Sequence, residues 1–311
     1  MSEESSSSLY RNGMVFTKRD INGNDGGSKG INLKKYEMHV ENARNYEGEE
    51  KLNLDKNGFE LLKSKLGKSE KDFFNNSYVL TSYYTHCANL VKNLTNASHV
   101  SAFDHNIRSA TGKKKKKRIA GGQQVQGPAH VVHGDYTLTS APARLKQLAQ
   151  PPRENDTIAE ILDPNDALLP RKIIDKVESG GRFSIINVWR NIVAEPVESN
   201  PIALCDAATV SSDDLVVFEI HYSDRVGENY FAKHNNNHRW YFYPKLTIDE
   251  VLLIKQWDSD GMLAYSDGTQ SDFNSGTRPC TFSFHAAFDD KNTRSDAPDR
   301  WSMEVRCIVV Y

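Results

Sequence analysis

Short β-rich runs, separated by turn signals, fill the chain after residue 182 and constrain its fold more than any other feature. About seven can be recognised: "RFSIINVW", "PIALCDAATV", "DLVVFEIHY", "HRWYFYP", "EVLLIKQW", "CTFSFHAAF" and "WSMEVRCIVVY". Strands of this length and spacing are typical of a β-barrel or sandwich. The chain has no internal repeat and no long alternation of strand with helix, so a Rossmann-type parallel sheet is disfavoured.

The first 182 residues have a different pattern. Residues 1–30 are rich in Ser, Gly, Asn and charge, so we expect a disordered or loosely attached tail there. Residues 78–95 carry apolar side chains at helical spacing, which predicts an amphipathic helix facing the core. Residues 150–182 are polar and helical in pattern. We therefore predict one domain over residues 31–311, mainly β with flanking helices.

Composition excludes several classes of protein. The 311 residues are 38% hydrophobic and 26% charged, with a net charge of −2, so the chain as a whole is not built to bind nucleic acid. No apolar run reaches the length of a membrane span, and the polar N-terminus lacks the pattern of a secretory signal. We expect a cytoplasmic protein whose four cysteines, with no CxxC pair among them, are reduced thiols.

A basic run, "TGKKKKKRIAGG", occupies residues 111–122 between glycines. It has three interpretations: a solvated loop, a nuclear address or nucleic-acid patch, and a basic funnel for an anionic substrate. The glycine flanks and the lack of aromatic residues favour the solvated loop.

The stretch "HVVHGDYT" holds a candidate pair of metal ligands. His133 and Asp135 are separated by one residue, so in an extended strand both side chains lie on the same side. Non-haem Fe(II) oxygenases bind the metal through two histidines and one carboxylate and leave three coordination positions open. A histidine and an aspartate at this spacing are common by chance, so the pair alone is a weak signal.

The third ligand is expected from a strand far downstream. His285 lies in the β-rich run "CTFSFHAAFDD", about 150 residues after the pair. His238, in "NNNHRWYFYP", also begins a strand-like run and is the main alternative. We favour His285 because of its place in the order of the motifs.

The last β-rich run carries an unusual row of polar residues. Arg300 opens it, and Ser302, Glu304 and Arg306 follow at alternate positions, so all four would point into the barrel. Such a row is costly in an apolar core but suits an anionic ligand. The arginine fork can bind a carboxylate through two hydrogen bonds, as the distal carboxylate of a 2-oxo acid would require.

From about residue 31 to the C-terminus, the chain resembles a family of iron/2-oxoglutarate-dependent hydroxylases and desaturases of secondary metabolism. The family includes gibberellin-desaturase-like proteins, the partner subunit of the cephem methoxylase and the aspergillic-acid hydroxylase. The resemblance implies a double-stranded β-helix, or jelly-roll barrel, and the use of Fe(II), 2-oxoglutarate and O2. The matching segments are "FDHNIRSA", "VHGDYT", "NVWRNI", "PIALCDAATV", "DLVVFEIHYSDRVGENY", "HRWYFYPKLTIDEVLLIKQWDS", "FHAAFDD" and "DAPDRWSMEVR".

The resemblance also implies roles for individual residues. His133, Asp135 and His285 would bind iron, and these three are the expected catalytic centre. The expected cofactor-binding residues are Arg300, Ser302, Asn187 and Tyr241, and the expected substrate-binding residues are Arg190, Arg306, Arg108 and Arg239. Two of the arginines have alternative interpretations: Arg190 as a structural ion-pair partner, and Arg306 as a partner of Glu304.

Several functions stay open at this point. Relatives of this kind close kainoid rings from N-prenylated glutamate, a small dicarboxylic substrate that would suit Arg108, Arg190 and Arg306. Hydroxylation or desaturation of another small metabolite is the broader expectation. The rivals are an inert binding or partner protein on the same barrel and an oxygenase that uses no 2-oxoglutarate. We expect a small, carboxylate-bearing substrate and neither nucleic acid nor membrane as a partner, and the oligomeric state stays open.

Overall fold

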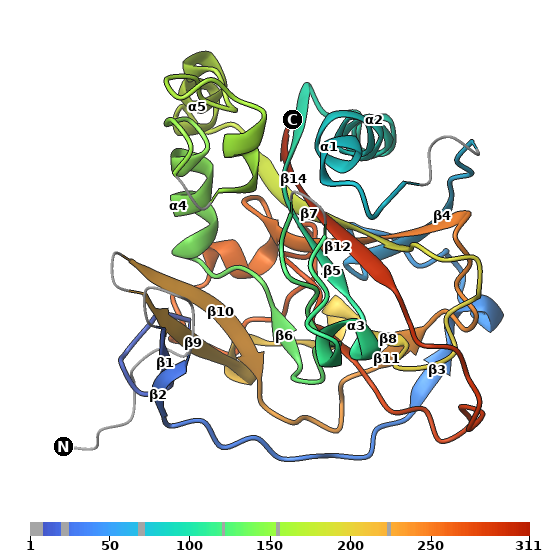
Figure 1. The fold of residues 1–311 in the computed structure, drawn as a ribbon. Helices are drawn as coiled ribbons and strands as arrows, with labels where there is room; N and C mark the ends of the chain where they lie inside the picture. Colours follow the sequence, from blue (N-terminus) through green and yellow to red (C-terminus); the bar gives the residue numbers. More distant parts are fainter. Residues whose placement is uncertain (1–8, 20–24, 68–71, 120–121, 154–155, 223–224) are drawn as a thin grey trace.

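The β-rich runs form two sheets that face each other across the interior of a double-stranded β-helix, as predicted (Figure 1). The computed structural model describes residues 9–19, 25–67, 72–119, 122–153, 156–222 and 225–311. In the larger sheet the strand order is β2-β1-β9-β10-β6-β13-β8-β11-β3, and in the smaller sheet it is β4-β12-β7-β14-β5. Most neighbouring strands are antiparallel; β1 with β9 and β11 with β3 are parallel.

The strands of the larger sheet are β1 (Phe16–Arg19), β2 (Asp25–Lys29), β3 (Val40–Asn42), β6 (His133–Gly134), β8 (Ile202–Cys205), β9 (Leu215–His221), β10 (Val226–Ala232), β11 (Trp240–Phe242) and β13 (His285–Ala287). Those of the smaller sheet are β4 (Phe59–Lys63), β5 (His99–Arg108), β7 (Phe183–Asn191), β12 (Glu250–Asp258) and β14 (Ser302–Val310).

The helices are short and lie mostly outside the sheets. They are α1 (Asn76–Tyr78), α2 (Tyr84–Thr95), α3 (Ala110–Lys114), α4 (Ser140–Gln147) and α5 (Arg171–Glu178), with a π-helical turn at Val79–Tyr83. Turns of 3-10 helix occur at Ala43–Asn45, Thr157–Glu160, Ala207–Thr209, Ser212–Asp214 and Met262–Tyr265. No helix in the described part of the chain is long and apolar enough to cross a membrane.

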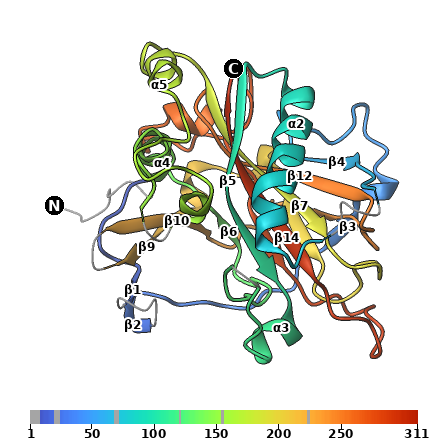
Figure 2. The ribbon, with the colours of Figure 1, turned by 45° about the horizontal axis from the view of Figure 1, so that its top comes forward.

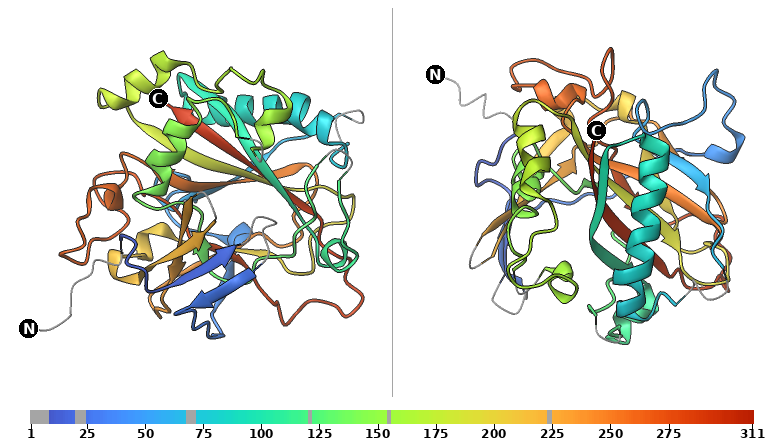
Figure 3. Two further views of the ribbon diagram at one scale, coloured as in Figure 1. Left: turned by 60° about the vertical axis from the view of Figure 1, so that its left-hand side comes forward. Right: turned by 90° about the horizontal axis from the view of Figure 1, so that it is seen from above.

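The helix predicted over residues 78–95 is confirmed and covers the outer face of the smaller sheet. Figures 2 and 3 both place α2 beside β5. Val79, Tyr83, Cys87 and Val91 follow each other at helical spacing and are fully buried against the sheet. The main apolar core therefore lies between the smaller sheet and this helix.

The two faces of the smaller sheet bury different kinds of side chain, because successive residues of a strand point to opposite faces. On β7, Val188 belongs to the apolar core beneath α2. Its neighbour Asn187 points the other way and donates a hydrogen bond to Asp135, next to the larger sheet. The space between the sheets is thus polar where the candidate ligands lie.

The basic run is exposed, as expected for a solvated loop. Its first part is the helix α3, which Ser109 caps by accepting a hydrogen bond from the backbone N–H of Gly112. The side chains of residues 113–118 are exposed, and residues 120 and 121 lie outside the described residues. Lys117 Nζ lies 4.7 Å from the ring centre of Trp301, so the run packs beside the strand that begins at Ser302.

The expectation of a loose tail over residues 1–30 is wrong for the part of it that the structure describes. β1 and β2 form a hairpin at the edge of the larger sheet, and β1 pairs in parallel with β9 (Figure 3). Leu9 is buried in the apolar cluster that contains Phe282. The polar composition of this segment reflects an edge hairpin, whose residues are largely exposed.

This packing predicts unequal effects of two neighbouring substitutions. Leu9→Ala should lower the free energy of unfolding by about 2–5 kcal/mol, because it leaves a cavity in a packed cluster. Tyr10→Ala is the matched control, since Tyr10 is exposed. Urea denaturation of both variants measures the difference. If both substitutions lower the free energy of unfolding by an equal, small amount, the segment is loosely attached after all.

Candidate metal centre

The three predicted ligands meet inside the barrel. β6 and β13 are neighbouring antiparallel strands, and His285 lies directly opposite His133 in their register. One ligand atom from each of His133, Asp135 and His285 can be chosen so that all lie within 4.8 Å of one another. His133 Nε2 is 3.6 Å from Asp135 Oδ1. Strand pairing thus joins residues that are far apart in the sequence into one candidate metal site.

Local packing explains the glycine between the first two ligands. Gly134 faces away from the site, and a Cβ atom there would approach the ring of Phe282 to 3.3 Å. His133 Nδ1 is 2.8 Å from the carbonyl oxygen of Val131, which leaves Nε2 directed at Asp135. A small residue at position 134 and this backbone contact orient the ligand pair.

The electrostatics of the cluster suit a metal cation. Burial and the neighbouring His285 lower the pKa of His133 to about 4, and burial also lowers the pKa of His285. Burial alone would raise the pKa of Asp135, but Arg306 and the two histidines hold it below its usual range. At neutral pH the cluster therefore presents two neutral imidazoles and one ionised carboxylate, which is the donor set that non-haem Fe(II) binds.

His238, the alternative third ligand, lies elsewhere. It is buried with its Nε2 3.1 Å from Asp214 Oδ2, and its ring contacts Trp240. Neither partner belongs to the cluster. The geometry therefore favours His285, as the order of the motifs did.

The barrel interior also contains a buried arginine and a buried serine that could bind an anion. Arg300 is 4% exposed and forms no ion pair within the part of the chain that the structure describes. Among the described residues, neither its Nε nor the nearby Ser302 Oγ, both buried, has a hydrogen-bond partner. Burial and then the charge of Arg108 lower the pKa of Arg300 to about 10. A carboxylate at this position would supply the missing partner of both groups.

Arg108 lies beside this pair. It ends β5 directly opposite Ser302 on β14, so the two side chains share the inward face. One of its nitrogens donates to the carbonyl oxygen of Gly127, and Arg108 makes no ion pair among the described residues. Arg108 therefore adds a second guanidinium beside the predicted clamp of Arg300 and Ser302.

Three predicted pocket residues lie away from the cluster. Arg190 points to the opposite face of β7 from Asn187, where it donates to Tyr83 Oη, to the carbonyl oxygens of Ser64 and Ile248 and to Ser64 Oγ. Arg239 is exposed and pairs with Asp206. The ring of Tyr241 packs on Tyr46 and Phe59. Arg190 therefore does not face the cluster, against the expectation that it binds substrate. The contacts of Arg239 and Tyr241 do not place them at the cluster, and their expected roles stay predictions.

Asn187 and Arg306 reach the cluster, but through Asp135. Asn187 Nδ2 is 2.9 Å and Arg306 Nε is 3.2 Å from Asp135 Oδ2. Arg306 also binds Asp104 and Glu304, so it is engaged by three carboxylates and is not a free cation for substrate. This contact confirms the alternative interpretation that Arg306 pairs with Glu304.

Sequence reasoning missed Gln256. Its Oε1 accepts a hydrogen bond from the backbone N–H of Asp135, while its buried Nε2 has no partner within the described segments. Gln256 sits where the register of β12 shifts between Lys255 and Trp257. Such a bulge redirects a side chain, and nothing in the run "EVLLIKQW" signals its position.

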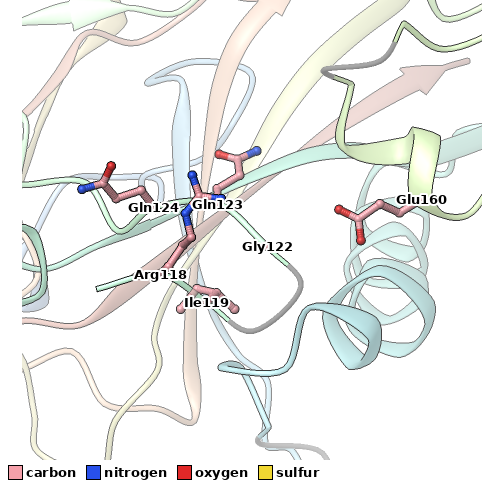
Figure 4. Close-up of a pocket in the computed structure, with 6 residues that line it drawn as sticks. All are labelled: Arg118, Ile119, Gly122, Gln123, Gln124 and Glu160. Atoms are coloured by element: carbon pink, nitrogen blue, oxygen red, sulfur yellow. The ribbon is translucent and has the colours of Figure 1, made fainter. Parts of the chain in front are cut away.

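A pocket on the protein surface lies apart from this centre (Figure 4). It is lined by Arg118, Ile119, Gly122, Gln123, Gln124 and Glu160, none of which contributes to the cluster or the clamp. We assign it no role in the chemistry.

Comparisons with known proteins agree with this geometry. The family model described as "Oxidoreductase/YMDC permease-like domain" matches residues 11–310. An uncharacterised protein from the 3′ region of dcmA of Methylophilus leisingeri is 44% identical over 187 residues, which cover 60% of this chain and 85% of that protein. The hydroxylase/desaturase efuI of Hormonema carpetanum is 28% identical over 305 residues, covering 92% of this chain and 88% of efuI.

Two further comparisons extend over nearly the whole chain. The α-ketoglutarate-dependent dioxygenase phiK of a fungal species is 26% identical over 293 residues, covering 92% of this chain and 87% of phiK. The solved structure of the iron and α-ketoglutarate-dependent endoperoxidase NvfI superposes with a TM-score of 0.69 at 22% identity, covering 96% of this chain and 93% of NvfI. This likeness supports the double-stranded β-helix.

The lowered pKa of His133 predicts how acid affects the metal-free protein. Between pH 6.5 and 4 the unfolded chain binds a proton at His133 that the folded chain does not, so stability falls as the pH falls. From pH 7 to pH 5 this residue should cost about 2 kcal/mol of unfolding free energy. Urea titrations of the wild type and His133→Gln should show a flatter pH profile for the variant. Parallel profiles would contradict the burial of a neutral His133.

Proposed function

This chain belongs to the oxidoreductase/YMDC permease-like domain family and is an iron(II)/2-oxoglutarate-dependent dioxygenase, and from that premise we propose that it oxidises a C–H bond of a small, carboxylate-bearing metabolite. Its relatives include enzymes named as hydroxylases or desaturases. The observation that carries the proposal is the cluster of His133, Asp135 and His285 beside a buried cationic clamp.

The residues present fit both iron and the co-substrate. The cluster offers two neutral nitrogens and one carboxylate, the three protein ligands of a facial triad. Arg300 Nε and Ser302 Oγ are buried and have no partner in the part of the chain that the structure describes, so they fit the distal carboxylate of 2-oxoglutarate. Iron with 2-oxoglutarate supplies an oxidant, generated from O2, that is strong enough to break an unactivated C–H bond. The protein's residues have to bind, orient and shield the reactants.

Each group of residues has a separate task in this proposal. His133, Asp135 and His285 would hold the metal through two imidazoles and one carboxylate, and the remaining positions would be left to the reactants. Arg300 donates hydrogen bonds to the far end of 2-oxoglutarate and so fixes its direction toward the metal. Trp189, whose ring lies 5.8 Å from the Arg300 guanidinium, shields that charge from water. Fixed placement and exclusion of water keep the oxidant directed at one bond.

Arg108 defines the proposed substrate class. It faces the same interior as the clamp and has nitrogens beyond the one bound to Gly127. Once 2-oxoglutarate neutralises Arg300, Arg108 is left to bind a carboxylate of the substrate.

Closure of a kainoid ring on N-prenylated glutamate loses part of its support, because Arg190 and Arg306 are held by protein groups. That substrate becomes one member of a screen of small acids.

Loss of one cluster residue should remove both activity and metal binding. His133→Ala and Asp135→Ala should abolish succinate formation and weaken Fe(II) binding, because each removes one of three metal ligands. Circular dichroism should report an unchanged fold. Wild-type turnover in either variant would refute the assignment of the metal ligands.

The clamp of Arg300 and Ser302 can be tested through the affinity for 2-oxoglutarate. Arg300→Ala should raise the KM for 2-oxoglutarate at least tenfold, from the loss of about 1.5–3 kcal/mol for a charge-assisted hydrogen bond. Arg300→Lys should also be impaired, since one ammonium group cannot reproduce the fork. Arg239→Ala is the control, because Arg239 is exposed and pairs with Asp206. If Arg300→Ala leaves this KM unchanged, the clamp is misassigned.

The role of Arg108 can be tested once a substrate is known. Succinate release screened against small acidic metabolites should identify a carboxylate-bearing substrate. Arg108→Gln should then raise the KM for that substrate about tenfold or more and leave the KM for 2-oxoglutarate within about threefold. A rise only in the KM for 2-oxoglutarate would assign Arg108 to the co-substrate clamp instead.

A further inference from the structure

We propose that Arg306 and Asn187 are positioning residues that hold Asp135 as a one-oxygen ligand of the metal, so that three coordination positions stay free for the co-substrate and O2. This inference rests on the proposed metal centre and concerns residues that do not themselves bind the metal.

Asp135 is fixed at four points. Its backbone N–H donates to Gln256 Oε1 at 3.1 Å, and its carbonyl oxygen accepts from Asn229 Nδ2 at 3.3 Å. Its Oδ2 accepts from Asn187 Nδ2 at 2.9 Å and from Arg306 Nε at 3.2 Å. The residue is therefore held in place from both sheets before any ligand arrives.

The two oxygens of the carboxylate have different surroundings. An ionised carboxylate has about two acceptor sites on each oxygen. Asn187 and Arg306 use both sites of Oδ2, whereas Oδ1 is the oxygen that faces His133 Nε2 at 3.6 Å. Only Oδ1 is left for a metal. A carboxylate that bound through both oxygens would take a position that the bidentate 2-oxo acid or O2 needs.

Arg306 is itself fixed by its other partners. Its terminal nitrogens lie 3.0 Å from Asp104 Oδ2 on β5 and 3.0 Å from Glu304 Oε1 on β14. The guanidinium is buried, and its three bonds point in three directions, so it cannot turn to follow a moving carboxylate. Arg306 thus joins the smaller sheet to the ligand that follows β6 in the larger sheet.

These bonds of Asn187 and Arg306 are explained less well by stabilisation of the fold than by positioning of Asp135. Buried ion pairs contribute little net stability, because desolvation offsets their attraction. The network also converges on Oδ2 of Asp135, whereas Oδ1 is the oxygen that faces His133. Residues that orient a metal ligand in this way typically change metal affinity 10–100-fold when they are replaced.

The test compares three variants by Mn(II) binding, without co-substrate or turnover. Asn187→Ala removes one donor from Oδ2, and Arg306→Lys keeps a charge but loses the three-way fork. Asn191→Ala is the matched control: Asn191 lies on the same face of the same strand but donates to the carbonyl oxygens of Val193, Glu195 and Leu246. Titration followed by electron paramagnetic resonance gives the Kd, and water-proton relaxation by bound Mn(II) reports how many positions water can occupy.

We expect Asn187→Ala and Arg306→Lys to raise the Kd for Mn(II) at least tenfold and to lower the relaxation per bound Mn(II), because a freed Oδ2 displaces a water. Asn191→Ala should bind Mn(II) within about twofold of the wild type, even if it unfolds more easily. Should Arg306→Lys fail to fold, Asn187→Ala carries the test.

Wild-type affinity and relaxation in Asn187→Ala would overturn the inference while leaving the metal centre intact. A wild-type protein that binds no Mn(II) would instead overturn the metal centre on which the inference depends.

Discussion

The pairing of β6 with β13 is the constraint on which the rest of the site depends. It sets His285 directly opposite His133 and brings Asp135 to the same place. A register shift of one residue would turn an imidazole to the other face of the sheet, because side chains alternate along a strand. β6 is only two residues long. Its position is therefore secured by neighbours, including the bond from Asp135 to Gln256 and the packing of Phe282 against Gly134.

The smaller sheet buries apolar side chains on one face and polar side chains on the other. Its outer face meets α2 and forms the main apolar core. Its inner face carries Asn187, Glu304 and Arg306, which would be costly to bury alone. Arg306 binds both Glu304 and Asp135, and Asn187 binds Asp135. The fold can hold a polar site in its interior because most of its apolar burial lies on the other side of the sheet.

The fold class and the meeting of His133, Asp135 and His285 could be predicted from the sequence, because strand alternation and motif order carry that information. That Arg300 and Ser302 bind the co-substrate stays a prediction. The same alternation argues against Arg190: it lies three positions after Asn187 on β7, an odd spacing, so the two must face opposite sides. Gln256 could not be found, since a bulge in β12 redirects it. The N-terminal hairpin was missed because an exposed edge of a sheet needs few apolar residues. The substrate depends on the shape of the interior, which no motif encodes.

The most direct test of the account is an anaerobic titration of the purified protein with Fe(II) and 2-oxoglutarate. A weak visible charge-transfer band should appear and saturate at one iron and one 2-oxoglutarate per chain, because the co-substrate would chelate iron held by His133, Asp135 and His285. The band should be absent in Asp135→Ala. A wild-type protein that gives no band while it remains folded would contradict the central claim.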